Sequence, residues 1–109
     1  MVFKQPHTTS YYAASANHQT DYASLEGEQN TDVCVIGAGF TGVSTALHLA
    51  ERGYSVSVLE ANKVGWGASG RNGGQMIGGI SGENRLAASL GGDGERRLWE
   101  IGWAGHDII

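Results

Sequence analysis

The feature that most constrains the fold is the glycine pattern GAGFTG at residues 37–42, which joins the apolar run VCVI to a helix-like stretch. The apolar run, residues 33–36, predicts a parallel strand covered on both faces, with Cys34 as a small buried side chain. Residues 55–59 predict a second strand, and Gly53 ends the helix between the strands. The expected apolar face of that helix is made of Val43, Ala46, Leu47 and Ala50. The pattern therefore predicts an α/β fold built on a right-handed β-α-β unit.

The glycines lie where a dinucleotide-binding turn needs them. Gly37 permits a tight turn, Gly39 lets the backbone approach a pyrophosphate, and Gly42 allows the helix to pack closely on the sheet. The helix N-terminus offers unpaired N–H groups and the positive end of its dipole to phosphate. Glu60, after the second strand, would accept ribose hydroxyls and repel a 2′-phosphate. Residues 37–60 therefore predict an adenine dinucleotide other than NADP, and the alternative is that the glycines serve packing alone.

The choice between FAD and NAD depends on the stretch at 65–82, in which eight of eighteen residues are glycine. The stretch has neither a helical nor a strand period, and it predicts a loop. Backbone N–H groups and small side chains there can approach a second phosphate and a large planar ring, which favours FAD. A nicotinamide-binding domain would usually continue into further β-α-β repeats. An NAD-dependent dehydrogenase domain and a flexible surface loop are the alternatives.

Two helices are predicted after this loop, one over 83–90 and one that begins near Glu95. The second helix carries Leu98, Ile101, Ala104 and Ile108 at helical spacing. It reaches residue 109 without a Gly, Asn or basic cap, so a truncated, non-catalytic fragment is a further alternative.

Composition and charge exclude several classes of protein. The 109 residues carry a net charge of −4 with scattered Lys and Arg, so we expect no nucleic-acid partner. We expect no membrane span, because no apolar stretch reaches about 18 residues, and the single cysteine fits a reducing cytoplasm. No metal site is predicted, because His7, His18 and His106 show no metal-ligand spacing with one another or with Cys34. Residues 1–30 are polar, lack an apolar period and predict an irregular leader.

The stretch DVCVIGAGFTGVSTALHLAERGYSVSVLEANKVGWGASGRNGGQ, residues 32–75, resembles the N-terminal FAD-binding segment of the D-amino-acid oxidase/glycine oxidase flavoproteins. Its final loop and the leader SYYAASAN at 10–17 resemble most the members that act on gamma-glutamylputrescine. The resemblance implies a Rossmann-like βαβ FAD-binding unit, the N-terminal part of a larger two-domain flavoprotein. Residues 31–109 would be an incomplete portion of its FAD-binding domain.

The same resemblance implies an oxidoreductase that converts a C–N bond of an amine or amino acid to an imine. Dioxygen would reoxidise the flavin and give H2O2, so the partners would be a small-molecule amine and O2. No catalytic residue is identified in this chain, because the substrate residues of such enzymes come mainly from later chain.

Carried over position by position, the resemblance implies three groups of cofactor contacts. The pyrophosphate would face Gly37, Ala38, Gly39, Phe40, Thr41 and Gly42. The adenosine ribose would lie at Glu60 and Ala61. The phosphates and the flavin ring would lie near Gly67, Ala68, Ser69, Arg71, Asn72, Gly73, Gly74 and Gln75.

Overall fold

The computed structural model describes residues 6–7, 9–17 and 21–108. His18, part of the predicted leader and the last residue of the predicted domain lie outside these ranges. The chain divides into two compact units, a first unit of Met1–Gly73 and a second unit of Gly74–Ile109. The domain division predicted at residue 30 stays a prediction.

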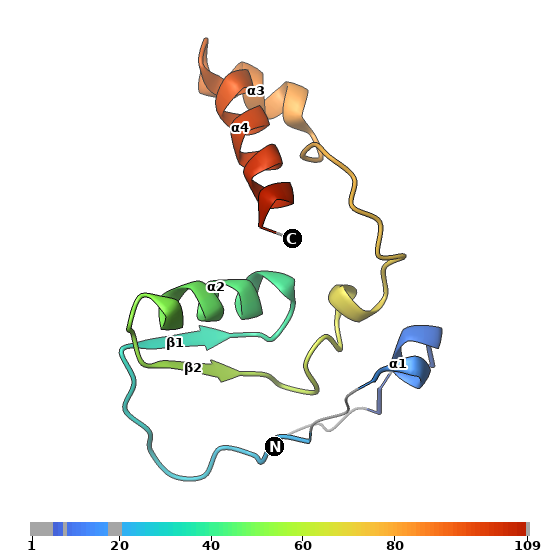
Figure 1. The fold of residues 1–109 in the computed structure, drawn as a ribbon, viewed down its shortest axis with the longest axis vertical. Coiled ribbons are helices and arrows are strands. Elements are labelled where there is room, and N and C mark those ends of the chain that lie inside the picture. The colour runs from blue at the N-terminus through green and yellow to red at the C-terminus, as the bar shows by residue number, and fades with distance from the viewer. Residues whose placement is uncertain (1–5, 8, 18–20, 109) are drawn as a thin grey trace. The chain divides into compact units, whose positions relative to one another are not determined.

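The first unit contains the predicted β-α-β arrangement (Figure 1). Strand β1 (Val33–Ile36) leads into helix α2 (Phe40–Glu51), and strand β2 (Val56–Leu59) follows and pairs with β1 in parallel. The register places Val33 beside Val56 and Ile36 beside Leu59. The predicted α/β fold with parallel strands is confirmed, and β2 begins one residue later than expected.

The start of the sheet is fixed by hydrogen bonds around Ser55. Its carbonyl oxygen accepts from the N–H groups of Asp32 and Val33, at 3.1 and 3.2 Å. The Asp32 carboxylate accepts from the Ser55 hydroxyl at 2.6 Å and from the Ser55 N–H at 2.8 Å. These hydrogen bonds lower the pKa of Asp32 below its usual value, with the hydroxyl bond as the largest cause. Ser55 therefore links the two strands by hydrogen bonds at the amino end of the sheet and is not itself part of β2.

The predicted burial on both faces of the sheet is wrong for the described residues. Cys34 and Ile36 are exposed, because successive side chains alternate and α2 packs on the face that carries Val35. The predicted helix face is also displaced. Val43 and Leu47 are exposed, while the partly buried positions include Gly42, Ala46 and Leu49. The helix is apolar on more than one side, so periodicity alone could not select the face that meets the sheet.

The leader contains a short helix, α1 (Tyr11–Ser15), which corrects the expectation of an irregular segment. Ser10 is the N-cap of this helix, and its hydroxyl accepts from the Ala13 N–H at 3.2 Å. The sequence SYYAAS thus has a capping residue directly before a short run that can form one turn.

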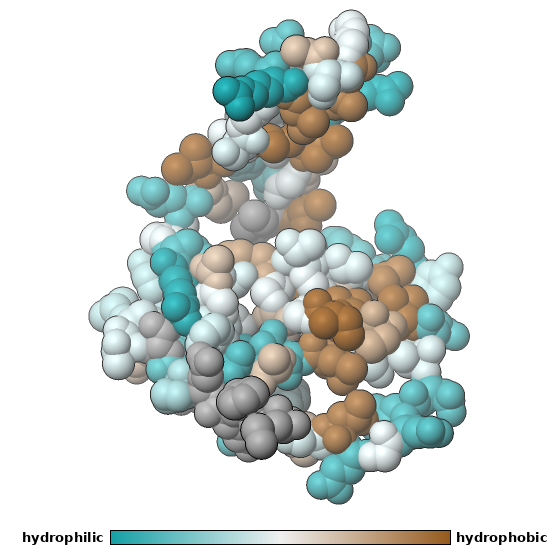
Figure 2. Space-filling model, turned by 180° about the vertical axis from the view of Figure 1, so that it is seen from behind, coloured by the Kyte–Doolittle hydropathy of each residue, from teal (hydrophilic) through white to brown (hydrophobic). Residues whose placement is uncertain are grey.

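The second unit is a pair of packed helices, α3 (Glu83–Leu90) and α4 (Gly94–Asp107), close to the predicted bounds. Gly94 and Leu98 are buried between them, and a Cβ on Gly94 would lie 2.6 Å from the Cβ of Leu90. The rings of Trp99 and Trp103 lie 5.8 Å apart and are largely exposed. Apolar surface is visible on this helix pair in Figure 2. Among the described residues, no helix has the length and apolar character needed to cross a bilayer.

Candidate functional site

The turn from β1 into α2 is built as the glycine pattern predicts. Gly37 has a φ of 98°, in the region that favours glycine, and its N–H continues the sheet by donating to the Leu59 carbonyl at 2.7 Å. A Cβ on Gly42 would overlap the carbonyl oxygen of Gly37, so only glycine allows the helix to start this close to the strand. Ala38, between them, is 3% exposed. The turn is therefore tight, and its backbone is fixed on both sides.

Glu60 is placed at this turn from the end of β2. One carboxylate oxygen accepts from the Ala38 N–H at 2.8 Å, and the other accepts from the Asn62 N–H at 2.9 Å. The hydrogen bond from Ala38, followed by that from Asn62, lowers the pKa of Glu60 below its usual value despite partial burial. Sequence reasoning placed Glu60 at a ribose and missed its role in holding the turn. A backbone hydrogen bond from Ala61 also contributes to the lower pKa, and the carboxylate keeps acceptor capacity for a ligand hydroxyl.

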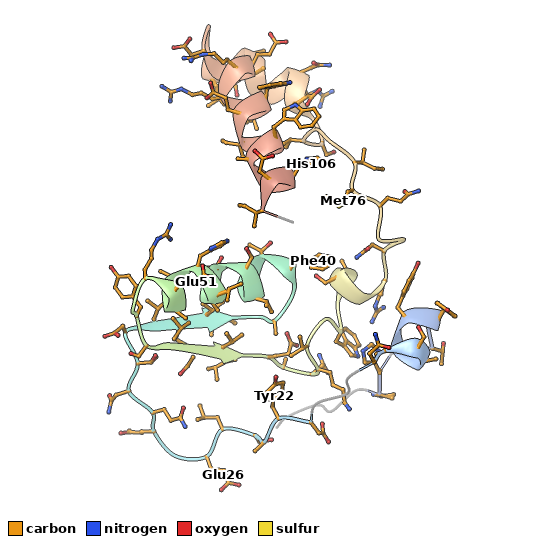
Figure 3. The ribbon with its side chains drawn as sticks, in the orientation of Figure 1. Tyr22, Glu26, Phe40, Glu51, Met76 and His106 are labelled. Atoms are coloured by element: carbon orange, nitrogen blue, oxygen red, sulfur yellow. The ribbon has the colours of Figure 1, made fainter. Side chains whose placement is uncertain are left out.

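The N-terminus of α2 receives a partner from the glycine-rich loop. Gly39 is the N-cap and supplies no side chain, and the Phe40 N–H donates to the Ser69 hydroxyl at 2.9 Å. The N–H groups of Thr41 and Gly42 follow in the first helical turn, where an α-helix offers them no intrahelical acceptor. The Phe40 side chain is exposed at this end of the helix, as Figure 3 shows. The helix start therefore keeps donors for an anion and is anchored to the loop through Ser69.

The loop itself folds back on the turn through backbone contacts. The Gly65 N–H donates to the Ala38 carbonyl at 2.9 Å, and a 3-10 helix, η1, follows over Ala68–Gly70. The side-chain amide of Asn72 donates to the carbonyls of Ala68 and Ser69, at 3.2 and 2.8 Å. This part of the predicted loop is thus ordered by its own polar side chains.

The structure brings three predicted segments together, residues 37–42, Glu60 and residues 65–72, and all three belong to the first unit. Ala61 and Gly67 are exposed beside them, and Gly73 ends the unit. Gly74 and Gln75 belong to the second unit. The contacts of all the predicted residues with the cofactor stay a prediction.

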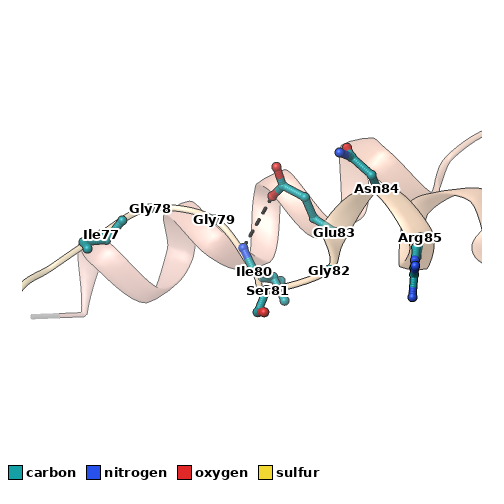
Figure 4. Close-up of a pocket in the computed structure, with 9 residues that line it drawn as sticks. All are labelled: Ile77, Gly78, Gly79, Ile80, Ser81, Gly82, Glu83, Asn84 and Arg85. Atoms are coloured by element: carbon teal, nitrogen blue, oxygen red, sulfur yellow. Dashed lines mark hydrogen bonds between the residues drawn. The ribbon is translucent and has the colours of Figure 1, made fainter. Parts of the chain in front are cut away.

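A separate hollow in the second unit contains none of the predicted site residues. It is lined by residues 77–85, and the Ile80 N–H donates to the Glu83 carboxylate at 3.4 Å across it (Figure 4). Within the described ranges, no group of three or more His, Cys, Asp or Glu side chains could hold a metal ion. The predicted cofactor-binding residues that the structure brings together lie at the turn in the first unit.

The turn fits the ADP half of a dinucleotide. A Cβ on Gly39 would lie 3.0 Å from the Ser69 hydroxyl oxygen, so the glycine keeps the backbone open at the helix start. The backbone donors of the helix start suit a pyrophosphate, and the ionised carboxylate of Glu60 suits ribose hydroxyls. Neither feature distinguishes FAD from NAD, because both cofactors contain this half.

The similarity of this chain to known proteins distinguishes FAD from NAD. The family described as "FAD dependent oxidoreductase" matches residues 32–109. Gamma-glutamylputrescine oxidoreductase of Escherichia coli (strain K12) is 49% identical over 104 residues, which cover 94% of this chain and 24% of that protein. The probable oxidoreductase OrdL of Haemophilus influenzae is 46% identical over 106 residues, covering 96% of this chain and 25% of that protein.

A second probable oxidoreductase OrdL, from Rhizobium meliloti, is 41% identical over 67 residues, which cover 62% of this chain and 16% of that protein. No solved structure is significantly similar to the chain. The chain spans about a quarter of the length of the first two relatives. The family indicates FAD as the cofactor, and the chain belongs to the FAD-dependent oxidoreductase family.

Proposed function

We propose that the protein is an FAD-dependent oxidoreductase that oxidises a C–N bond of an amine or amino acid, with a gamma-glutamylputrescine-like compound as substrate. The observation that carries the proposal is the meeting of the glycine turn, Glu60 and Ser69 at the start of α2, in a chain that belongs to this family. The similarity to gamma-glutamylputrescine oxidoreductase supports the choice of substrate.

In this proposal the described residues bind and orient the cofactor. The N–H groups of Thr41 and Gly42 at the start of α2 would donate to the pyrophosphate of FAD. Glu60 would accept the ribose hydroxyls through the lone pairs that its backbone donors leave available. Arg71 and Asn72 would lie near the phosphates and the flavin, on a loop that Ser69 ties to the helix start.

When bound, FAD would supply two-electron redox chemistry, by which two electrons and two protons would leave the CH–NH group of the amine and pass to dioxygen to give H2O2. The amine would thereby become an imine, and water would hydrolyse the imine to a carbonyl compound and ammonia or an amine. The protein's part in this sequence is positioning and electrostatics, and a neutral amine is the form that loses the hydride equivalent.

The full-length protein tests the proposal directly. We expect it to show the visible absorbance bands of bound flavin, and to form peroxide with gamma-glutamylputrescine but not with glycine, sarcosine or proline. The absence of flavin bands even after FAD is added would overturn the flavoprotein assignment. Peroxide formation with glycine or sarcosine alone would keep the reaction type and refute the substrate. The cytoplasm is the compartment that we propose for the enzyme, and fractionation of cells that produce it tests this placement.

A further inference from the structure

Trp66 connects the leader to the loop that holds Ser69. Its indole N–H donates to the backbone carbonyl of Pro6 at 3.1 Å, between residues sixty positions apart in the sequence. The leader passes close to η1 as well, because a Cβ on Gly70 would lie 4.0 Å from the Cε1 atom of His7. Both contacts lie within the first unit. The leader is therefore attached to the same loop that meets the glycine turn.

A second contact ties the leader to this region. The Lys63 ammonium lies 3.5 Å from the Asp21 carboxylate, just before Trp66 in the chain. Both side chains are substantially exposed, so this ion pair contributes little by itself. It does place the leader against residues 63–70 at more than one point. The indole bond to Pro6 is the contact with defined direction.

Trp66 also holds Arg71 through two further contacts. The Arg71 Nε donates to the Trp66 carbonyl oxygen at 3.1 Å, and its guanidinium carbon lies 4.4 Å from the centroid of the indole ring. A guanidinium over an indole face at this distance is a cation–π arrangement. One edge and one face of the guanidinium are thus occupied, and the terminal nitrogens remain to meet an anion. A single residue therefore contacts the leader with its indole N–H and Arg71 with its ring and carbonyl.

We propose that Trp66 is a positioning residue for cofactor binding, which links Pro6 of the leader to Arg71. The leader fixes the position of the loop, and Arg71 is oriented to bind the phosphate groups of FAD. The role of Arg71 rests on the proposed function, whereas the connection between the leader and Trp66 does not depend on it. In this proposal Trp66 acts through Arg71 and does not itself contact the reacting atoms.

A double-mutant cycle in the full-length protein tests the link. One variant is Trp66→Phe, which keeps an aromatic face under Arg71 and removes the indole N–H. A second variant lacks residues 2–7, and a third variant combines both changes. Each single change should weaken FAD binding by more than twofold and by up to about fivefold, because the lost hydrogen bond lowers affinity through the loss of preorganisation of Arg71. The combined variant should bind FAD no more weakly than the deletion variant, because the deletion already removes the contact between Trp66 and Pro6. The dissociation constant is measured by titrating apoprotein with FAD and following flavin fluorescence.

Two further variants separate positioning from general packing. Trp99→Phe is the matched control, because the structure describes no hydrogen bond for its indole N–H, and it should leave FAD affinity unchanged. Trp66→Leu also removes the ring under Arg71, so it should weaken FAD binding further than Trp66→Phe. The proposal is overturned if Trp66→Phe leaves FAD affinity within about twofold of wild type. Multiplicative effects in the combined variant would overturn it too.

Limited proteolysis distinguishes failure of this link from failure of the proposed function. In protein without FAD, cleavage within the leader should be faster in Trp66→Phe than in wild type or Trp99→Phe. This result would support the attachment of the leader to Trp66 even if the wild-type protein bound no FAD. Equal cleavage rates in all three proteins would refute it, whatever the cofactor.

Discussion

Glu60→Gln is the substitution that tests the turn most directly. Glutamine has nearly the same shape, but only one of its two terminal atoms accepts hydrogen bonds. In the folded protein both oxygens of Glu60 accept backbone donors, from Ala38 at 2.8 Å and from Asn62 at 2.9 Å. The variant must therefore lose one of these bonds, and the surviving bond loses its charge assistance. At this half-buried position the two losses together amount to about 2 kcal/mol.

Amide hydrogen exchange measures this local loss in the full-length protein without cofactor. Two kcal/mol of lost protection corresponds to about 30-fold faster exchange, and we expect that increase at the amide of Ala38 or Asn62. Glu26→Gln is the matched control, because Glu26 is exposed, points away from the ribbon in Figure 3 and has no described hydrogen bond. Unchanged exchange at both amides in Glu60→Gln would refute the reasoning, and so would equal acceleration in the control.

The low pKa of Glu60 predicts how the local stability of the turn depends on pH. Hydrogen bonds from Ala38 and Asn62 hold the folded pKa of Glu60 below its usual value of 4.5. Its contribution to stability is therefore complete above that value and is lost as the pH falls through the lower, folded pKa. Protection of the Ala38 amide, corrected for intrinsic exchange, should decrease on acidification below about pH 4.5 in wild type. In Glu60→Gln this decrease should be absent.

Three other substitutions test neighbouring contacts. Ser69→Ala removes the hydrogen-bond acceptor at the start of α2. It should lower the free energy of unfolding of the apoprotein by about 1 kcal/mol, measured by urea denaturation. An unchanged urea midpoint would contradict this prediction. Gly42→Ala places a methyl group against the Gly37 carbonyl and should destabilise the first unit by about 1–3 kcal/mol in the same assay, whereas full stability would mean that the turn is looser than described. Asp32→Asn removes the acceptor charge at Ser55, whose bonds lower the pKa of the Asp32 carboxyl. We expect wild type to lose thermal stability as the pH falls below about 3.8, and this loss should be smaller in the variant. Identical pH profiles would count against this last contact.

The elements of the fold could be predicted because their signals are local. The apolar run at 33–36, the helical spacing from Val43 and the second run ending at Leu59 each specify one element without reference to the rest of the chain. The glycine turn is equally local, since Gly37 and Gly42 are five residues apart and meet through the backbone. The two helices of the second unit follow from the same kind of signal.

The contacts that complete the site are not local, and no sequence pattern indicates them. Ser69 reaches Phe40 across 29 positions, and Trp66 reaches Pro6 across sixty. A serine or tryptophan in a glycine-rich loop has many possible partners, and only the path of the folded chain selects one. The exposure of Cys34 has a similar origin, because a strand of apolar residues does not reveal whether one face or both will be covered.

Glu60 shows why the functional prediction and the structural role need not compete. An acid at the end of the second strand is expected to meet a ribose, and in the structure it meets backbone N–H groups first. Those donors keep the carboxylate ionised and fix its orientation before any ligand arrives. A hydroxyl that then donates to one of its remaining lone pairs meets an acceptor that is already ordered, so less conformational entropy is lost on binding. The bonds that hold the turn therefore also prepare Glu60 for the cofactor, and protonation of this carboxylate should weaken both.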